Sequence, residues 1–448
     1  MKKSSYLVMI TLIGAFGGLL FGYDTAVISG AIGFLETKFG LDANMKGWAV
    51  SSAILGCIIG VALAGYIADS IGRKKTLIIT AFLFAISAIG CAVAANFTQL
   101  VVARIVGGLG VGAASMLSPL YISEIAPAHK RGMLVSLYQL AIVIGINIVF
   151  FANYMIAGSN TEQWNIDLGW RYMLGSETIP AILFLLALFF VPESPRWLSK
   201  KGRDVEALDV LSKINSKEIA IKVHFDIKAV LGQEKGTLSE LFAPGLRVAM
   251  VIGIFLALFS QITGINAIMY YAPEILKGAG FGVDSALMQT VIIGVINTIF
   301  TFVAIKYIDK LGRRTLLIWG VSGMIVCLLA IGILFQTGLT SGPWLLIFIL
   351  GFVGCFGTSL GPIPWVLISE IFPTKNRGVA MSLAIMVLWI GVWLISQFTP
   401  VLLENIGAGY TFWLFAFNAI LLLIFAVKVI PETKGKTLEE IEKSWTKK

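Results

Sequence analysis

Long apolar runs follow one another along nearly the whole 448-residue chain. We count about twelve, and each is roughly 20 residues long, which is the length an α-helix needs to cross the hydrocarbon core of a bilayer. Only 13% of the residues are charged, whereas a soluble protein carries about a quarter. Because lipid offers the backbone no hydrogen-bond partners, such runs must be helical. The sequence therefore predicts an all-α membrane protein with twelve transmembrane helices.

Lysine and arginine are distributed unevenly between the loops that twelve helices would create. Basic clusters occupy residues 2–3, 73–75, 130–131, 310–314, 375–377 and 434–436, and a longer basic stretch runs over 196–247. All of these fall on one side, whereas the opposite loops hold few, such as Lys38, Lys46 and Lys277. Because cytoplasmic loops are the ones enriched in basic residues, both termini are expected in the cytoplasm of a cell-membrane protein. The net charge of +9 is then explained by the basic cytoplasmic loops of a membrane protein. No nucleic-acid partner is expected.

The chain carries an internal repeat. The segment DSIGRK at 69–74 recurs as DKLGRR at 309–314, SEIAPAHKRG at 123–132 recurs as SEIFPTKNRG at 369–378, and Pro–Glu at 192–193 recurs at 431–432. The three offsets lie between 239 and 246 residues. They predict an N-terminal six-helix half (1–192), a cytoplasmic linker of short amphipathic helices (193–246), a C-terminal six-helix half (247–430) and a cytoplasmic tail (431–448). Two parallel six-helix repeats suit a transporter whose substrate binds between them.

Three charged residues lie deep inside the apolar runs: Asp24, Arg104 and Glu177. Each costs about 2.5–3.5 kcal/mol at the centre of a membrane helix, so such residues face the interior of the bundle and usually pair. Burial favours the protonated carboxyl, and a nearby guanidinium favours the carboxylate. If Arg104 moves between Asp24 and Glu177, protonation of Asp24 is tied to conformation. The alternative is a static ion pair, although the second half holds Leu350 where the repeat would place an arginine.

Neutral amides and aromatic side chains interrupt the other apolar runs. An amide offers both donors and acceptors, which a neutral polyol requires, and an aromatic face can stack on a sugar ring. Pro362 and Pro364, with Gly361, are expected to break the tenth helix near a ligand. The alternative for each amide is a hydrogen bond between helices, worth about 0.6 kcal/mol. The candidate sugar-binding residues are Gln139, Gln261, Asn266, Tyr270, Asn297, Trp365 and Trp389.

Enzymatic signatures are missing from the sequence. The four cysteines lie inside predicted spans without the C-x-x-C spacing of a metal or redox site. The two histidines lie in predicted loops, so no base is available for a hydrolase triad. We expect no metal, no cofactor and no enzymatic activity.

Several of these motifs together resemble the sugar porters of the major facilitator superfamily. They are the two Asp–Gly–Arg loops, the two S-E-I-x-P loops, PESPRWL at 192–198 and PETKGKTLEE at 431–440. The resemblance covers nearly the whole chain and is greatest to bacterial proton-coupled pentose and hexose symporters, the D-xylose symporters especially. It implies the major facilitator fold, and it implies that Asp24, Arg104 and Glu177 couple transport to protons. It also implies that the sugar contacts include Phe21, Gln139, Gln261, Asn266, Asn297 and Trp365.

The same resemblance implies an ion-pair network that holds the cytoplasmic side shut. Gly72 and Gly312 would permit tight turns, and acidic and basic residues of both halves would form the network. Exposed ion pairs of little energetic consequence are the alternative. The residues of this expected cytoplasmic gate are Asp69, Gly72, Arg73, Glu124, Arg131, Asp309, Gly312, Arg313, Glu370 and Arg377.

The sequence departs from the family pattern at three positions that bear on sugar preference. Ser260 stands where a second glutamine of the seventh helix is common, and Leu388 and Val392 stand where relatives have amides. We therefore expect proton symport of a monosaccharide, either D-xylose or a hexose such as glucose, by alternating access. Passive facilitated uniport of the same sugars is the alternative. The expected partners are the sugar, protons and membrane lipid, and the protein is expected to be monomeric.

Overall fold

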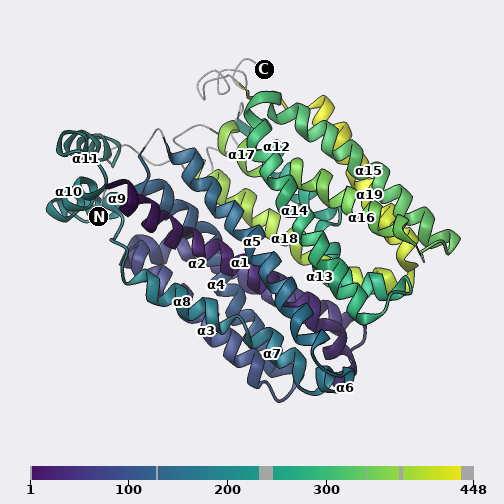
Figure 1. Ribbon diagram of the computed structural model, residues 1–448. Coiled ribbons are helices and arrows are strands. Elements are labelled where there is room, and N and C mark those ends of the chain that lie inside the picture. Colours follow the sequence, from purple (N-terminus) through teal and green to yellow (C-terminus); the bar gives the residue numbers. More distant parts are fainter. Residues whose placement is uncertain (1–2, 128–129, 232–245, 341, 373–376, 435–448) are drawn as a thin grey trace. The chain divides into compact units, whose positions relative to one another are not determined.

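The computed structural model describes residues 3–127, 130–231, 246–340, 342–372 and 377–434, and within these ranges it contains helices and no strand (Figure 1). The helices are α1 (Lys3–Phe39), α2 (Ala43–Ile71), α3 (Arg73–Val93), α4 (Phe97–Ile125), α5 (Arg131–Gly158), α6 (Glu162–Trp164), η2 (Asn165–Gly169), α7 (Trp170–Gly175), α8 (Thr178–Leu188), α9 (Pro195–Lys200), α10 (Asp204–Ile214), α11 (Lys217–Leu231), α12 (Leu246–Ile262), α13 (Ile265–Gly278), α14 (Val283–Leu311), α15 (Arg313–Thr337), α16 (Pro343–Thr358), α17 (Ile363–Ile371), α18 (Arg377–Asn405) and α19 (Gly407–Lys428).

Twelve membrane spans were predicted, and the described residues contain twelve segments long and apolar enough to cross a bilayer. Nine spans are single helices, whereas three are assembled from consecutive shorter ones: α6 to α8, α12 with α13, and α16 with α17. The predicted all-α fold with twelve transmembrane helices is confirmed.

Two of the interrupted spans have clear local causes. The tenth span stops at Thr358 and resumes at Ile363, as predicted from Gly361 and the following prolines. The seventh span stops at Ile262 and resumes at Ile265 because Gly264 has a φ of 94°, a left-handed conformation that glycine adopts without strain. A Cβ at Gly264 would also lie 2.4 Å from the Phe415 ring. This second break was not predicted.

The chain forms two compact units, which are described separately. Unit 1 comprises Met1–Thr25, Leu55–Ile148 and Arg171–Glu234, and unit 2 comprises Ala26–Ile54, Val149–Trp170 and Lys235–Lys448. In unit 1, α3 packs on α4 and α8. In unit 2, α15 packs on α16 and α19, α12 packs on α18, and α14 packs on α16 and α13. The six-helix halves inferred from the repeat stay a prediction.

The described part of the predicted linker consists of α9, α10 and α11, which pack on one another within unit 1 (Figure 1). Leu211, Ala220 and Ile227 form their buried core, with Val223 against it. These core residues come from α10 and α11, whose apolar residues lie on one buried face, as expected of amphipathic helices. Residues 232–245 of the linker lie outside the described ranges.

Candidate functional site

The buried acid–base pair of unit 1 joins α1 to α4. Arg104 Nη1 donates to Asp24 Oδ1 at 2.7 Å and to the Asp24 carbonyl oxygen at 3.1 Å. The two side chains are 2% and 1% exposed. An ion pair removed from water must offset a large desolvation penalty, which requires close contact and additional hydrogen bonds. The main-chain carbonyl of Asp24 supplies one such bond.

Glu177, the third predicted coupling residue, lies within electrostatic range of both Asp24 and Arg104. It precedes α8 and is 2% exposed. The structure thus brings the three residues together, with Arg104 bound to Asp24 and with no ion pair to Glu177 among the described contacts. Three polar atoms of the set make no hydrogen bond to a described residue: Asp24 Oδ2, Arg104 Nε and Glu177 Oε1. Leaving buried polar atoms unpaired is energetically costly.

A neutral polar group lies at the break between α12 and α13 in unit 2. Asn266 Nδ2 donates to Gln261 Oε1 at 2.8 Å, and Gln261 Nε2 donates to Ser260 Oγ at 3.0 Å. Residues five apart do not face each other on a continuous helix, so the turn at Gly264 is what allows the two amides to meet. Ser260 was noted only as a departure from the family pattern, and its contact with Gln261 was not foreseen.

The other predicted sugar-binding residues are divided between the two units. Within unit 2, Tyr270 on α13, Asn297 on α14 and Trp389 on α18 are buried, whereas Trp365 on α17 is half-buried. Within unit 1, Phe21 on α1 and Gln139 on α5 are half-buried. Each unit therefore contributes partly accessible amide or aromatic groups.

The first predicted gate cluster lies in unit 1 at the start of α3. The Arg73 guanidinium donates to both carboxylate oxygens of Glu124, at 3.0 and 3.1 Å, and to Asp69 Oδ1 at 2.9 Å. Lys200 Nζ of α9 binds the other Asp69 oxygen at 2.7 Å. Such two-pronged arginine–carboxylate contacts are among the stronger polar interactions in proteins. Arg131, also predicted to belong to this cluster, donates to the Ser123 carbonyl oxygen at 3.1 Å.

The second gate cluster repeats this arrangement in unit 2 at the start of α15. Arg313 Nη2 donates to Glu370 Oε1 at 3.0 Å, and Thr433 Oγ1 donates to Glu370 Oε2 at 2.6 Å. Both clusters therefore join an arginine at a helix start to a glutamate more than 50 residues later. The side chains of Asp309 and Arg377 lie outside the described part of this region.

Two further glutamates complete these clusters and were not among the predicted site residues. Glu193 accepts the backbone N–H groups of Arg73 and Lys74, at 2.8 and 3.1 Å. Glu432 accepts those of Arg313 and Arg314, at 3.0 and 3.1 Å. A carboxylate at a helix N-terminus satisfies free N–H groups and the helix dipole. Burial raises the pKa of Glu193, and the N–H groups that it binds oppose that rise. The repeated Pro–Glu dipeptide was the sequence signal for both residues.

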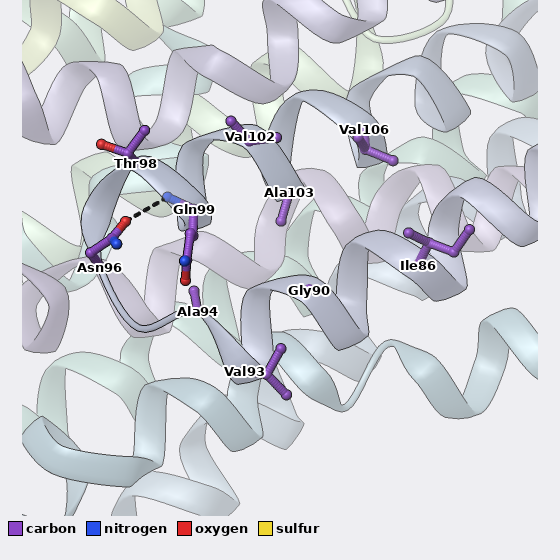
Figure 2. A pocket seen from close by; sticks show the side chains of 10 residues that line it. All are labelled: Ile86, Gly90, Val93, Ala94, Asn96, Thr98, Gln99, Val102, Ala103 and Val106. Carbon is purple, nitrogen blue, oxygen red and sulfur yellow. Dashed lines mark hydrogen bonds between the residues drawn. The ribbon is translucent and has the colours of Figure 1, made fainter.

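A groove of about 570 Å³ lies between α3 and α4, apart from the predicted site residues (Figure 2). Ile86, Val93, Val102 and Val106 make it largely apolar, and Asn96 caps α4 at one end by accepting the Gln99 N–H. Because both helices are membrane spans, this surface suits contact with lipid hydrocarbon. Among the described residues, no cluster of three or more potential ligands could hold a metal ion.

Twelve spans and the close match to solved transporter structures define a membrane protein of the major facilitator fold. One such structure is the partially occluded, inward-open xylose transporter XylE from Escherichia coli, with a TM-score of 0.88 and 42% identity over 97% of this chain and 100% of that chain. A family profile described as sugar (and other) transporter matches residues 10–445. The chain belongs to this family.

Two similar proteins span almost the same length. The chain is similar to the arabinose-proton symporter of Bacillus subtilis (strain 168), with 47% identity over 99% of this chain and 96% of the relative. It is also similar to the D-xylose-proton symporter of Escherichia coli (strain K12), with 43% identity over 99% of this chain and 96% of that protein.

Proposed function

We propose that the protein is a proton-coupled monosaccharide symporter of the cell membrane, driven by the inward proton gradient. The observation that carries this proposal is the buried contact between Asp24 and Arg104. The names of the relatives, which are symporters of arabinose and D-xylose, support the same activity. The substrate is a pentose such as D-xylose or a hexose such as glucose.

The coupling mechanism follows from the chemistry of the three buried charged groups. While Arg104 contacts Asp24, the guanidinium favours the carboxylate and the proton is released. When Arg104 moves toward Glu177, Asp24 loses its partner in a site that excludes water, and the carboxyl takes up a proton. Asp24 therefore carries a proton inward in the loaded carrier and gives it up when Arg104 returns, so protonation is tied to conformation, which is what symport requires.

The sugar is held by neutral groups that each supply donors and acceptors. Asn266 donates to Gln261, and Gln261 donates to Ser260, which fixes the orientation of both amides. Their other hydrogen-bonding positions are left for sugar hydroxyls. Aromatic side chains provide flat faces for the apolar side of the ring. The proposed sugar-binding set is Phe21, Gln139, Gln261, Asn266, Tyr270, Asn297, Trp365 and Trp389.

Alternating access is proposed to arise from rocking of the halves at 1–192 and 247–430, with both termini in the cytoplasm. The two arginine–glutamate clusters at the starts of α3 and α15 are proposed to stabilise the closed cytoplasmic side. The working unit is proposed to be a monomer surrounded by lipid.

Uptake into proteoliposomes tests the function directly. Addition of sugar should make the external medium more alkaline, and an imposed proton gradient should drive accumulation. Asp24→Asn should abolish accumulation while retaining sugar exchange, since the neutral amide cannot release a proton. Asp284→Asn, at an exposed acid in the first turn of α14, is the matched control and should accumulate sugar normally. Accumulation by Asp24→Asn vesicles would overturn the coupling assignment, and downhill uptake without alkalinisation would favour the uniporter.

A further inference from the structure

The second carboxylate oxygen of Asp24, which is not the one that pairs with Arg104, lies against Gly107 of α4. Asp24 Oδ2 makes no hydrogen bond to a described residue, although the side chain is only 1% exposed. A Cβ placed on Gly107 would lie 2.9 Å from this oxygen and 2.4 Å from Ser87 Oγ of α3. Both oxygens therefore border the same small space, which exists because residue 107 has no side chain.

The hydroxyl proton of Ser87 already takes part in a hydrogen bond. Its hydroxyl donates to the Ala103 carbonyl oxygen of α4 at 2.8 Å, and the side chain is 2% exposed. A hydroxyl has one proton and two acceptor positions. Toward Asp24, Ser87 can therefore offer only lone pairs. These repel a carboxylate oxygen, but they can accept the O–H of a protonated carboxyl.

The remaining groups around Asp24 act differently on its two states. Arg104, on α4, contacts Oδ1 and favours the carboxylate. Glu177, before α8, is a second acid whose negative charge would oppose ionisation of Asp24. The thiols of Cys57 on α2 and Cys91 on α3 also lie within electrostatic range, and the Cys91 thiol contacts the Ser87 side chain. Among these neighbours, Ser87 supplies the hydroxyl oxygen that borders the same space as Asp24 Oδ2.

We propose that Ser87 accepts a hydrogen bond from Asp24 Oδ2 when Asp24 is protonated, and that Gly107 keeps the approach between the two groups open. Ser87 is then a positioning residue for the transported proton, because it stabilises the loaded carboxyl without carrying the proton itself. This inference rests on the proposed symport. In this scheme Arg104 stabilises the ionised form of Asp24, and Ser87 stabilises its protonated form.

The test measures sugar-dependent proton uptake into proteoliposomes as a function of external pH. Loss of one neutral hydrogen bond should lower the proton affinity about fivefold, so Ser87→Ala should move the half-maximal pH downward by roughly 0.7 units. Gly107→Ala should shift the profile the same way, because the new methyl group separates the two oxygens. Ser115→Ala removes a comparable buried serine bond, from Ser115 Oγ to the Gly112 carbonyl of α4, and should leave the midpoint unchanged.

Sugar exchange, which needs no net proton movement, reports whether each variant folds. If Ser87→Ala does not fold, Ser87→Cys replaces the hydroxyl by a weaker acceptor of similar size and should shift the midpoint in the same direction. An unchanged midpoint in a folded Ser87 variant would overturn the inference. Absence of sugar-dependent proton uptake in the unmodified protein would instead overturn the proposed function, so the two failures are distinguishable.

Discussion

Glu193 lies directly against Gly72, so that a Cβ on that glycine would be 2.2 Å from the Glu193 carboxylate. Gly72 has a φ of 105° and a ψ of 160°, a conformation almost confined to glycine, and it delivers the first N–H groups of α3 to that carboxylate. Gly312 and Glu432 repeat the arrangement at α15, where the corresponding approach is 2.5 Å. Glycine is thus required at each position both by the backbone conformation and by the closeness of the glutamate carboxylate.

Gly72→Ala should destabilise the protein by more than about 2 kcal/mol, since backbone strain of about 1–3 kcal/mol adds to displacement of Glu193. Thermal unfolding in detergent, followed by intrinsic tryptophan fluorescence, measures the effect. Gly338→Ala is the matched control: Gly338 ends α15 with a φ of 69°, and no described atom would lie within 4 Å of a Cβ added there. It should cost only about 1 kcal/mol. Equal losses in both variants would show that the contact with Glu193 contributes nothing.

Arg73→Lys should reduce transport about tenfold, because lysine keeps the charge but cannot bind both oxygens of Glu124 while also binding Asp69. The measurement is the initial rate of sugar uptake at equal protein density. Arg203→Lys is the control, since Arg203 and Glu206 form a two-pronged pair at the surface, where both side chains are about half exposed. It should transport normally. Normal uptake by Arg73→Lys would show that this cluster is an ion pair that does not contribute to transport.

Gln261→Ala should raise the sugar concentration needed for half-maximal uptake about five- to thirtyfold, which corresponds to one or two lost neutral hydrogen bonds of about 1 kcal/mol each. Its amide also orients Asn266, so the variant disturbs two groups at once. Competition binding with a panel of pentoses and hexoses measures the effect and identifies the preferred sugar. Gln289→Ala removes a glutamine that likewise donates to a serine, at 3.1 Å on α14, and should bind sugar normally. Unchanged sugar affinity in Gln261→Ala would show that the α12–α13 break is not part of the sugar site.

Ser51 and Gln397, which lie together in unit 2, should show a measurable energetic coupling. The buried Ser51 hydroxyl donates to Gln397 Oε1 at 2.7 Å, and Gln397 Nε2 donates to the Asn44 carbonyl at 3.1 Å. Hydrogen bonds between membrane helices average about 0.6 kcal/mol and reach about 1.7 kcal/mol. A double-mutant cycle of Ser51→Ala and Gln397→Leu, measured by reversible unfolding, should give a coupling in this range. Strictly additive effects would exclude an energetic contribution from this contact.

Local features were predictable because the physics behind them is local. The break before Ile363 follows from a glycine and two prolines in four residues, and the turns at Gly72 and Gly312 follow from repeated short motifs. The break at Gly264 was missed, since a single glycine inside an apolar run is common in membrane helices. The meeting of Gln261 with Asn266 depends on that break and was missed with it.

The sequence by itself determined that this chain spans a membrane twelve times and belongs among the sugar transporters. The length of each apolar run and the repeated motifs depend only on the order of the residues. It also predicted that Asp24, Arg104 and Glu177 face the interior of the bundle and pair, since isolated charges in lipid are costly. Only the tertiary structure decided that Arg104 holds Asp24 rather than Glu177, that Glu193 caps a helix 120 residues before it, and that Ser87 borders the free oxygen of Asp24. Such pairings depend on how helices rotate and cross, and many rotations bury the same apolar surface equally well.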